Sequence, residues 1–490
     1  MWGAISGVAY FSIYLGWWLS AYPLDWAGIN SNIFSFIFIF VTYLAIVFIC
    51  ASFFALFTCT LRSLSVSGHL LGVVIGAPCL WTLYEYLRAL VYSLFWTGQG
   101  ALIGAHWAFG NLGYILHNVT ALRSLASMGG VYLLSFLIVL ISALLVATVI
   151  CYQDGQINLS RRYGVVFLVI FLSWWFTGTI LNSKIAGMSS MGQIKVAVMG
   201  TYFPRGYVGD LEYTLNHVIA LRSRLVDASA SAELVIMPEG SGFLQSLEAD
   251  SVDIERGKIF FESIKQIEPV VLMDSIESRE AGVKFKHTRL LYFDSKDGLV
   301  DYYDKRLIFP GGEYVPQIVE SVLRVAGQSE VLEAFKRYRV LAPGERVSVV
   351  ANTRFGKIGG LICSAILSPE LGRGMVNNGA ELLVVVSSLA LFEANPIMQA
   401  ENRAMSQIRA IETGRDYLVV SNVGESLAIA RDGQIVEYID SGDETKVVLV
   451  NRYSNINFYT KYGNWIVWLS LFILLTYWLR QDKSVSNQLD

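Results

Sequence analysis

The chain is poor in charged residues and in cysteine, and each shortage excludes a class of protein. Only 16% of its 490 residues are charged while 54% are hydrophobic, which is too apolar for an ordinary soluble enzyme. The formal net charge is −3 and no basic run occurs, so nothing suggests a nucleic-acid partner. The five cysteines lie mostly in apolar segments and give no disulfide framework. The composition therefore predicts a membrane protein with a soluble part.

The sequence also lacks the patterns of the common cofactor sites. It has no clustered His/Cys/Asp spacing typical of a metal site and no glycine loop of the phosphate-binding type. The predicted soluble part contains only His217 and His287. Neither lies in a motif with a cysteine, which argues against a Cys–His mechanism. We therefore expect no metal and no cofactor.

Six apolar runs are candidates for crossing a bilayer, which takes about 20 residues. The first lacks the basic region of a signal peptide and should remain as a helix. Gly100–Leu116 is apolar but short and rich in glycine, so we expect it to be re-entrant or interfacial. Trp17, Trp18, Tyr22 and Trp26 are expected to form an interfacial belt rather than a substrate site. The six runs are Trp2–Ala21, Ile33–Leu61, His69–Leu94, Met128–Cys151, Val165–Leu181 and Trp465–Leu479.

Basic residues beside these runs predict the orientation. The positive-inside rule places their loops in the cytoplasm; the residues are Arg62, Arg161, Arg162, Arg480 and Lys483. Both termini are then cytoplasmic, and the long soluble part faces the exterior. We predict a multi-pass protein of the bacterial cytoplasmic (inner) membrane with its catalytic domain on the periplasmic or outer face. The predicted domains are a transmembrane bundle over 1–182, an extracytoplasmic domain over 183–462, and a transmembrane helix with a cytoplasmic tail over 463–490.

The soluble part alternates strand-like and helix-like patterns, which predicts a layered α/β sandwich. Turns at Lys296–Gly298 and Arg431–Gly433 predict antiparallel pairing in part of the sheet. Predicted helices are Asp210–Ala228, Asp253–Ile267 and Pro396–Thr413. Predicted strands are Ile194–Met199, Glu233–Met237, Pro269–Asp274, Leu290–Asp294, Lys357–Ile362, Leu382–Ser387, Leu418–Ser421 and Lys446–Val450.

Cys363 is the one cysteine outside the apolar runs. In those runs a thiol behaves as a small packing residue, whereas Cys363 follows a strand-like run and could be a nucleophile at a strand end. Glu239, in Met-Pro-Glu-Gly, could accept the thiol proton. Lys305, in Tyr-Asp-Lys-Arg, could stabilise an oxyanion. Taken singly, each residue also has a plain structural reading as a strand cysteine, a turn residue or a surface charge.

The order of these motifs carries a resemblance. Strand-Pro-Glu, Tyr-Asp-Lys and strand-Ile-Cys resemble the nitrilase (carbon–nitrogen hydrolase) superfamily, and segments 77–88, 310–316, 407–415 and 463–465 resemble the apolipoprotein N-acyltransferase family. The resemblance implies an α-helical membrane bundle joined to an α/β nitrilase-like α-β-β-α sandwich. It also implies a catalytic triad of Glu239, Lys305 and Cys363. Glu313 would help the base or position the acceptor amine.

The chain departs from this family's motifs beside the nucleophile. Ser364 and Ala365 stand where the family usually has Tyr and Glu, and Met237 stands where it has Trp. The segment 387–391 also differs from the usual Asn-Asp-Ala-Trp-Phe. The resemblance thus implies that the triad is kept, while supporting positions such as Ser364 and Ala365 are changed.

The implied reaction is transfer of a fatty acyl chain from a phospholipid, through a Cys363 thioester, to the α-amine of a diacylglyceryl-cysteine on an apolipoprotein. The implied partners are the phospholipid donor and the lipoprotein acceptor, and we expect a monomer. Two alternatives stay open. One is a membrane-anchored hydrolase or amidase on the same fold. The other is a degenerate, non-catalytic relative that acts as a binding protein, which the changes at Met237, Ser364 and Ala365 keep possible.

Overall fold

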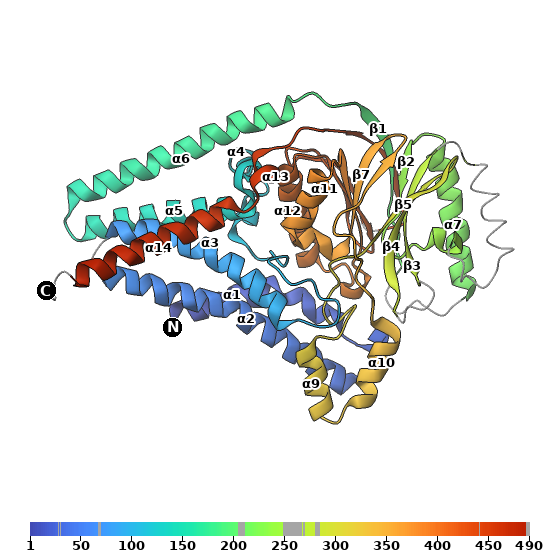
Figure 1. The fold of residues 1–490 in the computed structure, drawn as a ribbon, viewed down its shortest axis with the longest axis horizontal. Coiled ribbons are helices and arrows are strands. Elements are labelled where there is room, and N and C mark those ends of the chain that lie inside the picture. The colour runs from blue at the N-terminus through green and yellow to red at the C-terminus, as the bar shows by residue number, and fades with distance from the viewer. Residues whose placement is uncertain are drawn as a thin grey trace.

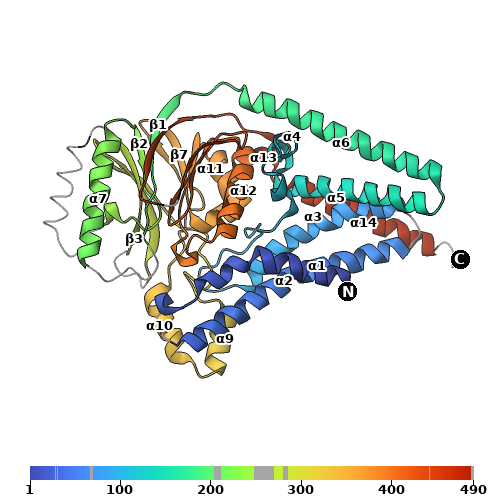
Figure 2. The same cartoon turned by 180° about the vertical axis from the view of Figure 1, so that it is seen from behind.

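The computed structural model describes residues 1–27, 29, 31–66, 70–203, 211–247, 267, 270–279, 285–440 and 442–486. Long helices form a bundle at one end of the molecule and two sheets lie at the other (Figure 1). The start of α1 (Trp2–Tyr14) and the end of α14 (Trp465–Ser486) both lie on the side of the bundle away from the sheets (Figure 2).

Four helices of the described chain are long and apolar enough to cross a membrane. The apolar part of α14 is shorter, Trp465–Leu479. These helices agree with the predicted membrane bundle, while the number of spans and the domain boundaries stay predictions. The four helices are α2 (Asn32–Val66), α3 (Leu70–Phe95), α5 (Ala126–Gln153) and α6 (Ile157–Ala186).

The first apolar run is not one continuous helix. The α-helix α1 ends at Tyr14, and a 3₁₀ helix, η1 (Gly16–Ala21), follows it. Glycine is a poor helix former, and Gly16 begins this change. The tighter turn of η1 points Trp17 toward α12 (Pro396–Thr413), where its indole N–H donates to Glu401. A membrane-adjacent segment therefore contacts the soluble domain directly.

The glycine-rich segment after α3 folds back on that helix. Arg88 Nη2 donates to Phe109 O at 2.6 Å and to Asn111 Oδ1 at 2.7 Å. One turn earlier, Glu85 accepts from the backbone N–H of Leu112 at 2.8 Å. Both side chains are buried, where polar groups are costly in an apolar bundle. These bonds satisfy part of each group, while Glu85 Oε2 and Arg88 Nε have no hydrogen-bond partner among the described residues. They fix the connection that carries Trp107 to the soluble domain.

The soluble domain consists of two six-stranded sheets. In each, three central strands run parallel and the flanking strands are antiparallel. The first sheet has the order β12 (Thr445–Asn451), β1 (Gln193–Met199), β2 (Leu234–Ile236), β3 (Val271–Ser278), β4 (His287–Asp294), β5 (Gly298–Asp304). The second has the order β11 (Ile435–Ile439), β10 (Ser426–Ile429), β9 (Tyr417–Asn422), β8 (Leu382–Ser388), β7 (Gly356–Ile362), β6 (Val350–Thr353).

The sheets pack face to face, and helices cover their outer faces. At the centre, Gly360 of β7 approaches β4 so closely that a Cβ would lie 2.4 Å from Leu290 Cδ2, so a larger residue here would displace buried side chains of β4. On the first sheet, α7 (Leu211–Ser229) packs through Leu221 and Leu225. On the second, α11 (Pro369–Asn377) and α12 lie between the sheet and the membrane helices (Figure 1). The α-β-β-α sandwich is therefore confirmed.

The predicted strands all correspond to strands of the structure, and both predicted turns join antiparallel neighbours, β4–β5 and β10–β11. Helix α12 has the predicted bounds, and α7 matches Asp210–Ala228 apart from its ends. The predicted helix over 253–267 lies outside the described residues except for its last position. The sequence missed β5, β6, β10 and β11, whose exposed or short apolar patterns are weak signals.

A helical hairpin extends from the soluble domain toward the start of the bundle. It consists of α9 (Gln317–Val325) and α10 (Ser329–Arg339), and it lies beside α2 in both views (Figures 1 and 2). The two other short helices, α4 (Thr120–Arg123) and α13 (Phe458–Tyr462), lie where the bundle meets the sandwich.

Candidate active site

Three strand ends bring the predicted triad to one cavity. Glu239 lies in the loop after β2, Lys305 directly follows β5, and Cys363 directly follows β7 as the first residue of the 3₁₀ helix η5 (Cys363–Leu367). All three line a cavity of about 890 Å³. Residues more than 120 positions apart in the sequence thus meet because the two sheets pack with these strand ends at the same edge.

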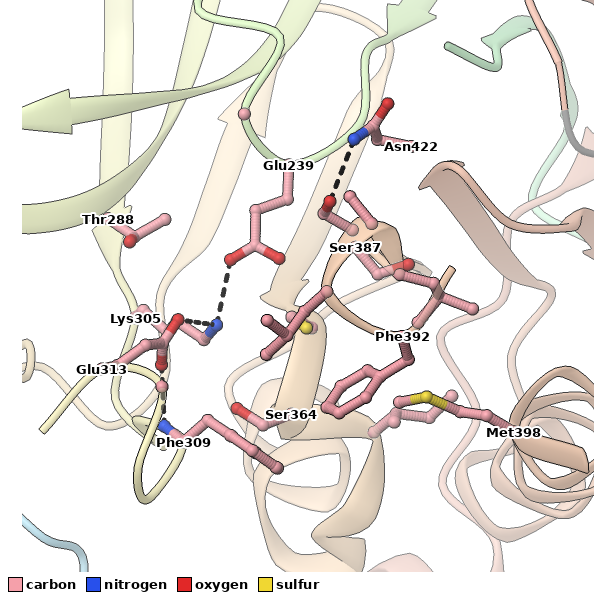
Figure 3. Close-up of a pocket in the computed structure, with 18 of the residues that line it drawn as sticks. Glu239, Thr288, Lys305, Phe309, Glu313, Ser364, Ser387, Phe392, Met398 and Asn422 are labelled. Carbon is pink, nitrogen blue, oxygen red and sulfur yellow. Dashed lines mark hydrogen bonds and ion pairs between the residues drawn. The ribbon is translucent and has the colours of Figure 1, made fainter. Parts of the chain in front are cut away.

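Lys305 is the centre of a buried ion cluster. Its Nζ lies 2.9 Å from Glu239 Oε1 and 2.6 Å from Glu313 Oε1, and Lys305 is only 1% exposed. Figure 3 shows the three side chains converging at one side of the pocket. Burial alone would lower the pKa of Lys305, but the carboxylates of Glu239 and Glu313 raise it well above its ordinary value. The side chain is therefore a fixed cation.

Glu313 is held by the turn that follows Lys305. The backbone N–H of Phe309 donates to Glu313 Oε2 at 2.7 Å, which leaves Oε1 for Lys305. Burial raises the pKa of Glu313, and the charge of Glu239 raises it further, against the opposing effect of Lys305. Glu313 can therefore hold a proton beside Lys305, as a group that both accepts and returns protons requires.

Cys363 occupies a strained position between strand and helix. Its φ is 46°, in the left-handed region that non-glycine residues seldom adopt and that is often found at functional sites. Burial raises the pKa of the Cys363 thiol to about 12, and the carboxylate of Glu239 adds to this effect while Lys305 opposes it. The resting thiol is therefore protonated, so attack on an ester needs a neighbouring base.

Of the two supporting residues predicted directly after Cys363, Ser364 lines the cavity and Ala365 does not. The hydroxyl of Ser364 lines the cavity and donates to the backbone carbonyl of Leu307, which links η5 to the segment after Lys305. Ala365 is 2% exposed and packs in the core between the sheets. It is absent from the described residues that line the cavity. Five of the six predicted site residues therefore meet at the cavity.

Asp274 anchors the loop that carries Glu239. Its carboxylate accepts from the hydroxyl of Ser241 and, at 2.6 Å, from the backbone N–H of Leu244. Burial raises the pKa of Asp274 to about 7, although these hydrogen bonds oppose the shift. The sequence analysis missed this residue. Its signal in the sequence is an aspartate directly after the apolar run Val270–Met273, where an unpartnered buried carboxylate would be costly.

Most of the cavity wall is aromatic or aliphatic, and it comes from segments far apart in the chain. Figure 3 shows Phe392 and Met398 on the side of the pocket away from Lys305. Trp17, Trp18 and Trp26 also line it, so the expectation that these tryptophans lie in an interfacial belt and not at a site is wrong for all three. The aromatic lining residues are Trp17, Trp18, Trp26, Tyr92, Trp107, Phe109, Phe203, Phe309 and Phe392. Such a wall suits a hydrocarbon chain.

Helix α12 contributes a second set of residues that the sequence analysis missed. Met398, Glu401, Asn402 and Met405 line the cavity, at positions i, i+3, i+4 and i+7 that lie on one face of a helix. The spacing of two methionines and a glutamate in the sequence is the signal that could have identified this helix face as part of a site. Among the described residues, no group of three or more His, Cys, Asp or Glu side chains is placed to hold a metal ion.

Comparisons with known proteins cover both parts of the chain. The family model "Carbon-nitrogen hydrolase" matches residues 193–453, and "Apolipoprotein N-acyltransferase N-terminal domain" matches residues 2–144. The chain is similar to proteins named apolipoprotein N-acyltransferase from three bacteria. It is 26% identical to that of Synechocystis sp. (74% of this chain, 68% of the relative), 24% to that of Thermotoga maritima (80% and 68%) and 23% to that of Nostoc sp. (99% and 92%). The resemblance found in the motifs is thus confirmed.

Proposed function

This chain belongs to the carbon-nitrogen hydrolase family, and we propose that it is a membrane-bound N-acyltransferase that moves a fatty acyl chain from a phospholipid to the α-amine of a diacylglyceryl-cysteine on a lipoprotein. The observation that carries this proposal is the composition of the cavity. Cys363 and the Lys305 cluster share it with a largely apolar wall supplied in part by η1 and by the segment after α3. A lipid substrate could therefore reach the thiol from the membrane side.

In the first half-reaction, Glu239 accepts the thiol proton as the sulfur attacks the ester carbonyl carbon of the phospholipid. The ammonium of Lys305 and the backbone N–H after Cys363 stabilise the tetrahedral oxyanion. The ester C–O bond then breaks, and the departing alkoxide takes the proton from Glu239. The products are an acyl thioester on Cys363 and a lysophospholipid.

In the second half-reaction, the neutral α-amine of the acceptor attacks the thioester carbonyl. The same cation stabilises the second oxyanion, the C–S bond breaks, and the amine proton passes through the carboxylate pair to the thiolate. The products are an amide and the free thiol. Glu313 supports both steps, because its bond to Lys305 fixes the ammonium and its raised pKa lets it share the proton.

We also propose the multi-pass placement in the bacterial cytoplasmic membrane with the soluble domain on its outer face. The four apolar helices support membrane insertion. The phospholipid donor and lipoprotein acceptor follow from the proposed reaction, and a monomer stays the expected state.

Mass spectrometry of the intact protein tests this function. After incubation with phospholipid, the wild type should gain the mass of one acyl chain on Cys363, and a diacylglyceryl peptide with a free α-amine should then remove it. Cys363→Ala should gain no mass. If water discharges the thioester as fast as the peptide does, the protein is a hydrolase. If no adduct forms under any condition, the non-catalytic alternative is correct.

A further inference from the structure

The cavity contains a second carboxyl group that the proposed mechanism does not use. Glu401, on the cavity face of α12, accepts a hydrogen bond at its Oε2 from the indole N–H of Trp17 at 3.2 Å. Its other oxygen, Oε1, is buried and makes no hydrogen bond among the described residues, although the side chain of Tyr14 lies near enough to oppose the rise in the pKa of this carboxyl. A buried polar atom without a partner costs free energy, so this carboxyl favours a ligand that can hydrogen-bond to it.

The charges around the cavity favour a cationic ligand. Lys305 is already bonded to Glu239 and Glu313, so no basic side chain of the described lining remains to pair with Glu401. The acidic residues in this lining are Asp25, Glu239, Glu277, Glu313 and Glu401, and the basic one is Lys305. Such an excess of acidic over basic groups disfavours an anion and favours a cation.

Aromatic rings beside Glu401 add to this preference. The Trp17 ring packs edge-on against Phe392 with centroids 4.9 Å apart, and Phe392 lies 6.0 Å from Phe309. Ring faces attract ammonium groups, and an apolar setting strengthens a carboxylate–ammonium hydrogen bond. Burial raises the pKa of Glu401 to about 9, so at pH 7 this carboxyl is protonated until an ammonium pairs with it, and binding then releases the proton.

We infer that Glu401, with Trp17 beside it, is the recognition site for the primary ammonium group of a lipid substrate. The inference rests on the proposed function, which brings two such groups to the cavity. One is the α-amine of the diacylglyceryl-cysteine acceptor, which binds as an ammonium and loses a proton before it attacks the thioester. The other is the headgroup amine of an ethanolamine phospholipid. Glu401 selects a lipid that carries an ammonium over an otherwise similar lipid without one.

Binding measurements separate the two sources. The full-length protein carries Cys363→Ala, so that no acyl group is transferred during the measurement. Native mass spectrometry then gives its affinities for two pairs of ligands. The first pair is phosphatidylethanolamine and phosphatidylglycerol. The second is a diacylglyceryl-cysteine peptide with a free α-amine and the same peptide N-acetylated. We expect the ammonium member of at least one pair to bind better.

Adding Glu401→Gln should weaken the binding of that ammonium-bearing ligand by about tenfold, equivalent to about 1.4 kcal/mol. The affinity for the other ligand of the pair should stay within about twofold. The pair that loses its preference identifies the source of the amine. The control is Glu330→Gln, an exposed acid on α10 that lines neither the cavity nor the ion cluster; it should change no affinity.

Two results would overturn the inference. In one, Glu401→Gln leaves every preference unchanged; in the other, it weakens both members of each pair equally. Failure of the proposed function looks different, because it appears as the absence of a Cys363 thioester in the wild-type protein. The binding preference can be measured in either case, so each conclusion can fail without the other.

Discussion

Replacing Lys305 with methionine tests the ion cluster most directly. Met keeps most of the side-chain volume but leaves Glu239 and Glu313 buried with no cation between them. Removing one partner of a buried ion pair typically costs about 3–5 kcal/mol. Protonation limits this cost only at low pH: keeping two carboxyls with ordinary pKa values near 4.3 neutral takes about 7 kcal/mol at pH 7, more than the cost itself, but about 2 kcal/mol at pH 5.

The stability loss of Lys305→Met should therefore depend on pH with a defined sign. The carboxyls of the folded variant have pKa values above their unfolded values, so the folded state binds more protons. Stability is then retained below about pH 4 and falls as pH rises toward the folded pKa. Thermal unfolding in detergent between pH 4 and 8 measures this. The control is Lys336→Met, since Lys336 pairs with Glu320 at 2.8 Å in a partly exposed position, where loss of the pair costs about 0–1 kcal/mol.

The same variant has a kinetic consequence. If the Lys305 ammonium stabilises the oxyanion, its loss should slow thioester formation by about 10²–10³-fold, as for removal of one oxyanion donor. Quenched-flow mass spectrometry of the acyl adduct gives this rate. A rate within about threefold of the wild type would remove Lys305 from the chemistry. If the stability of Lys305→Met depended on pH in the same way as that of Lys336→Met, the Lys305–Glu239–Glu313 cluster would not contribute to stability as a buried ion cluster.

Three further outcomes follow from the described residues. Because burial raises the pKa of Cys363 to about 12, the rate of its alkylation by iodoacetamide should keep rising through pH 10, and a plateau near pH 8.5 would show an ordinary thiol. Burial raises the pKa of Asp274 in the folded state to about 7, so this group makes the stability fall as pH rises from about 4 to 7. The melting temperature of Asp274→Asn should therefore depend less on pH over this range. An unchanged pH dependence would contradict the raised pKa of Asp274. In intact cells or spheroplasts, an impermeant thiol reagent should label Asp297→Cys but not Arg161→Cys. Both positions are exposed, and the predicted orientation puts them on opposite sides of the membrane. Labelling of Arg161→Cys alone would overturn the predicted orientation.

The meeting of Glu239, Lys305 and Cys363 at one cavity could be predicted from the sequence because each lies at or just after the end of a strand. Strand ends have short local signals, such as the apolar run before Cys363 and the Pro-Glu after β2, and the family's motif order links them. The edge strands β5, β6 and β11 could not be predicted this way. Their exposed, irregular patterns come from being paired on one side only, a property set by the whole sheet rather than by nearby residues.

The cavity wall could not be predicted for a different reason. Trp17 and Glu401 are 384 positions apart, and nothing local says that η1 docks against α12. A tryptophan at a membrane edge is explained equally well by an interfacial belt. Only the break of the first helix at Gly16, together with the hydrogen bond of Asn395 to Ser20 at 2.9 Å, brings these aromatic residues into the site.

The departures beside the nucleophile take on a different meaning once burial is known. The sequence suggests that Ser364 and Ala365 leave a roomier, less acidic site. In the structure, the hydroxyl of Ser364 donates a hydrogen bond to the Leu307 carbonyl, and Ala365 is buried in the core. A glutamate at position 365 would therefore place an unpaired carboxylate among apolar side chains, at a cost of several kcal/mol, unless η5 moved. Restoring the family residues at these two positions is thus a change of local backbone as well as of side chain. The acidic groups of the cavity come from elsewhere in the chain, namely Asp25, Glu239, Glu277, Glu313 and Glu401.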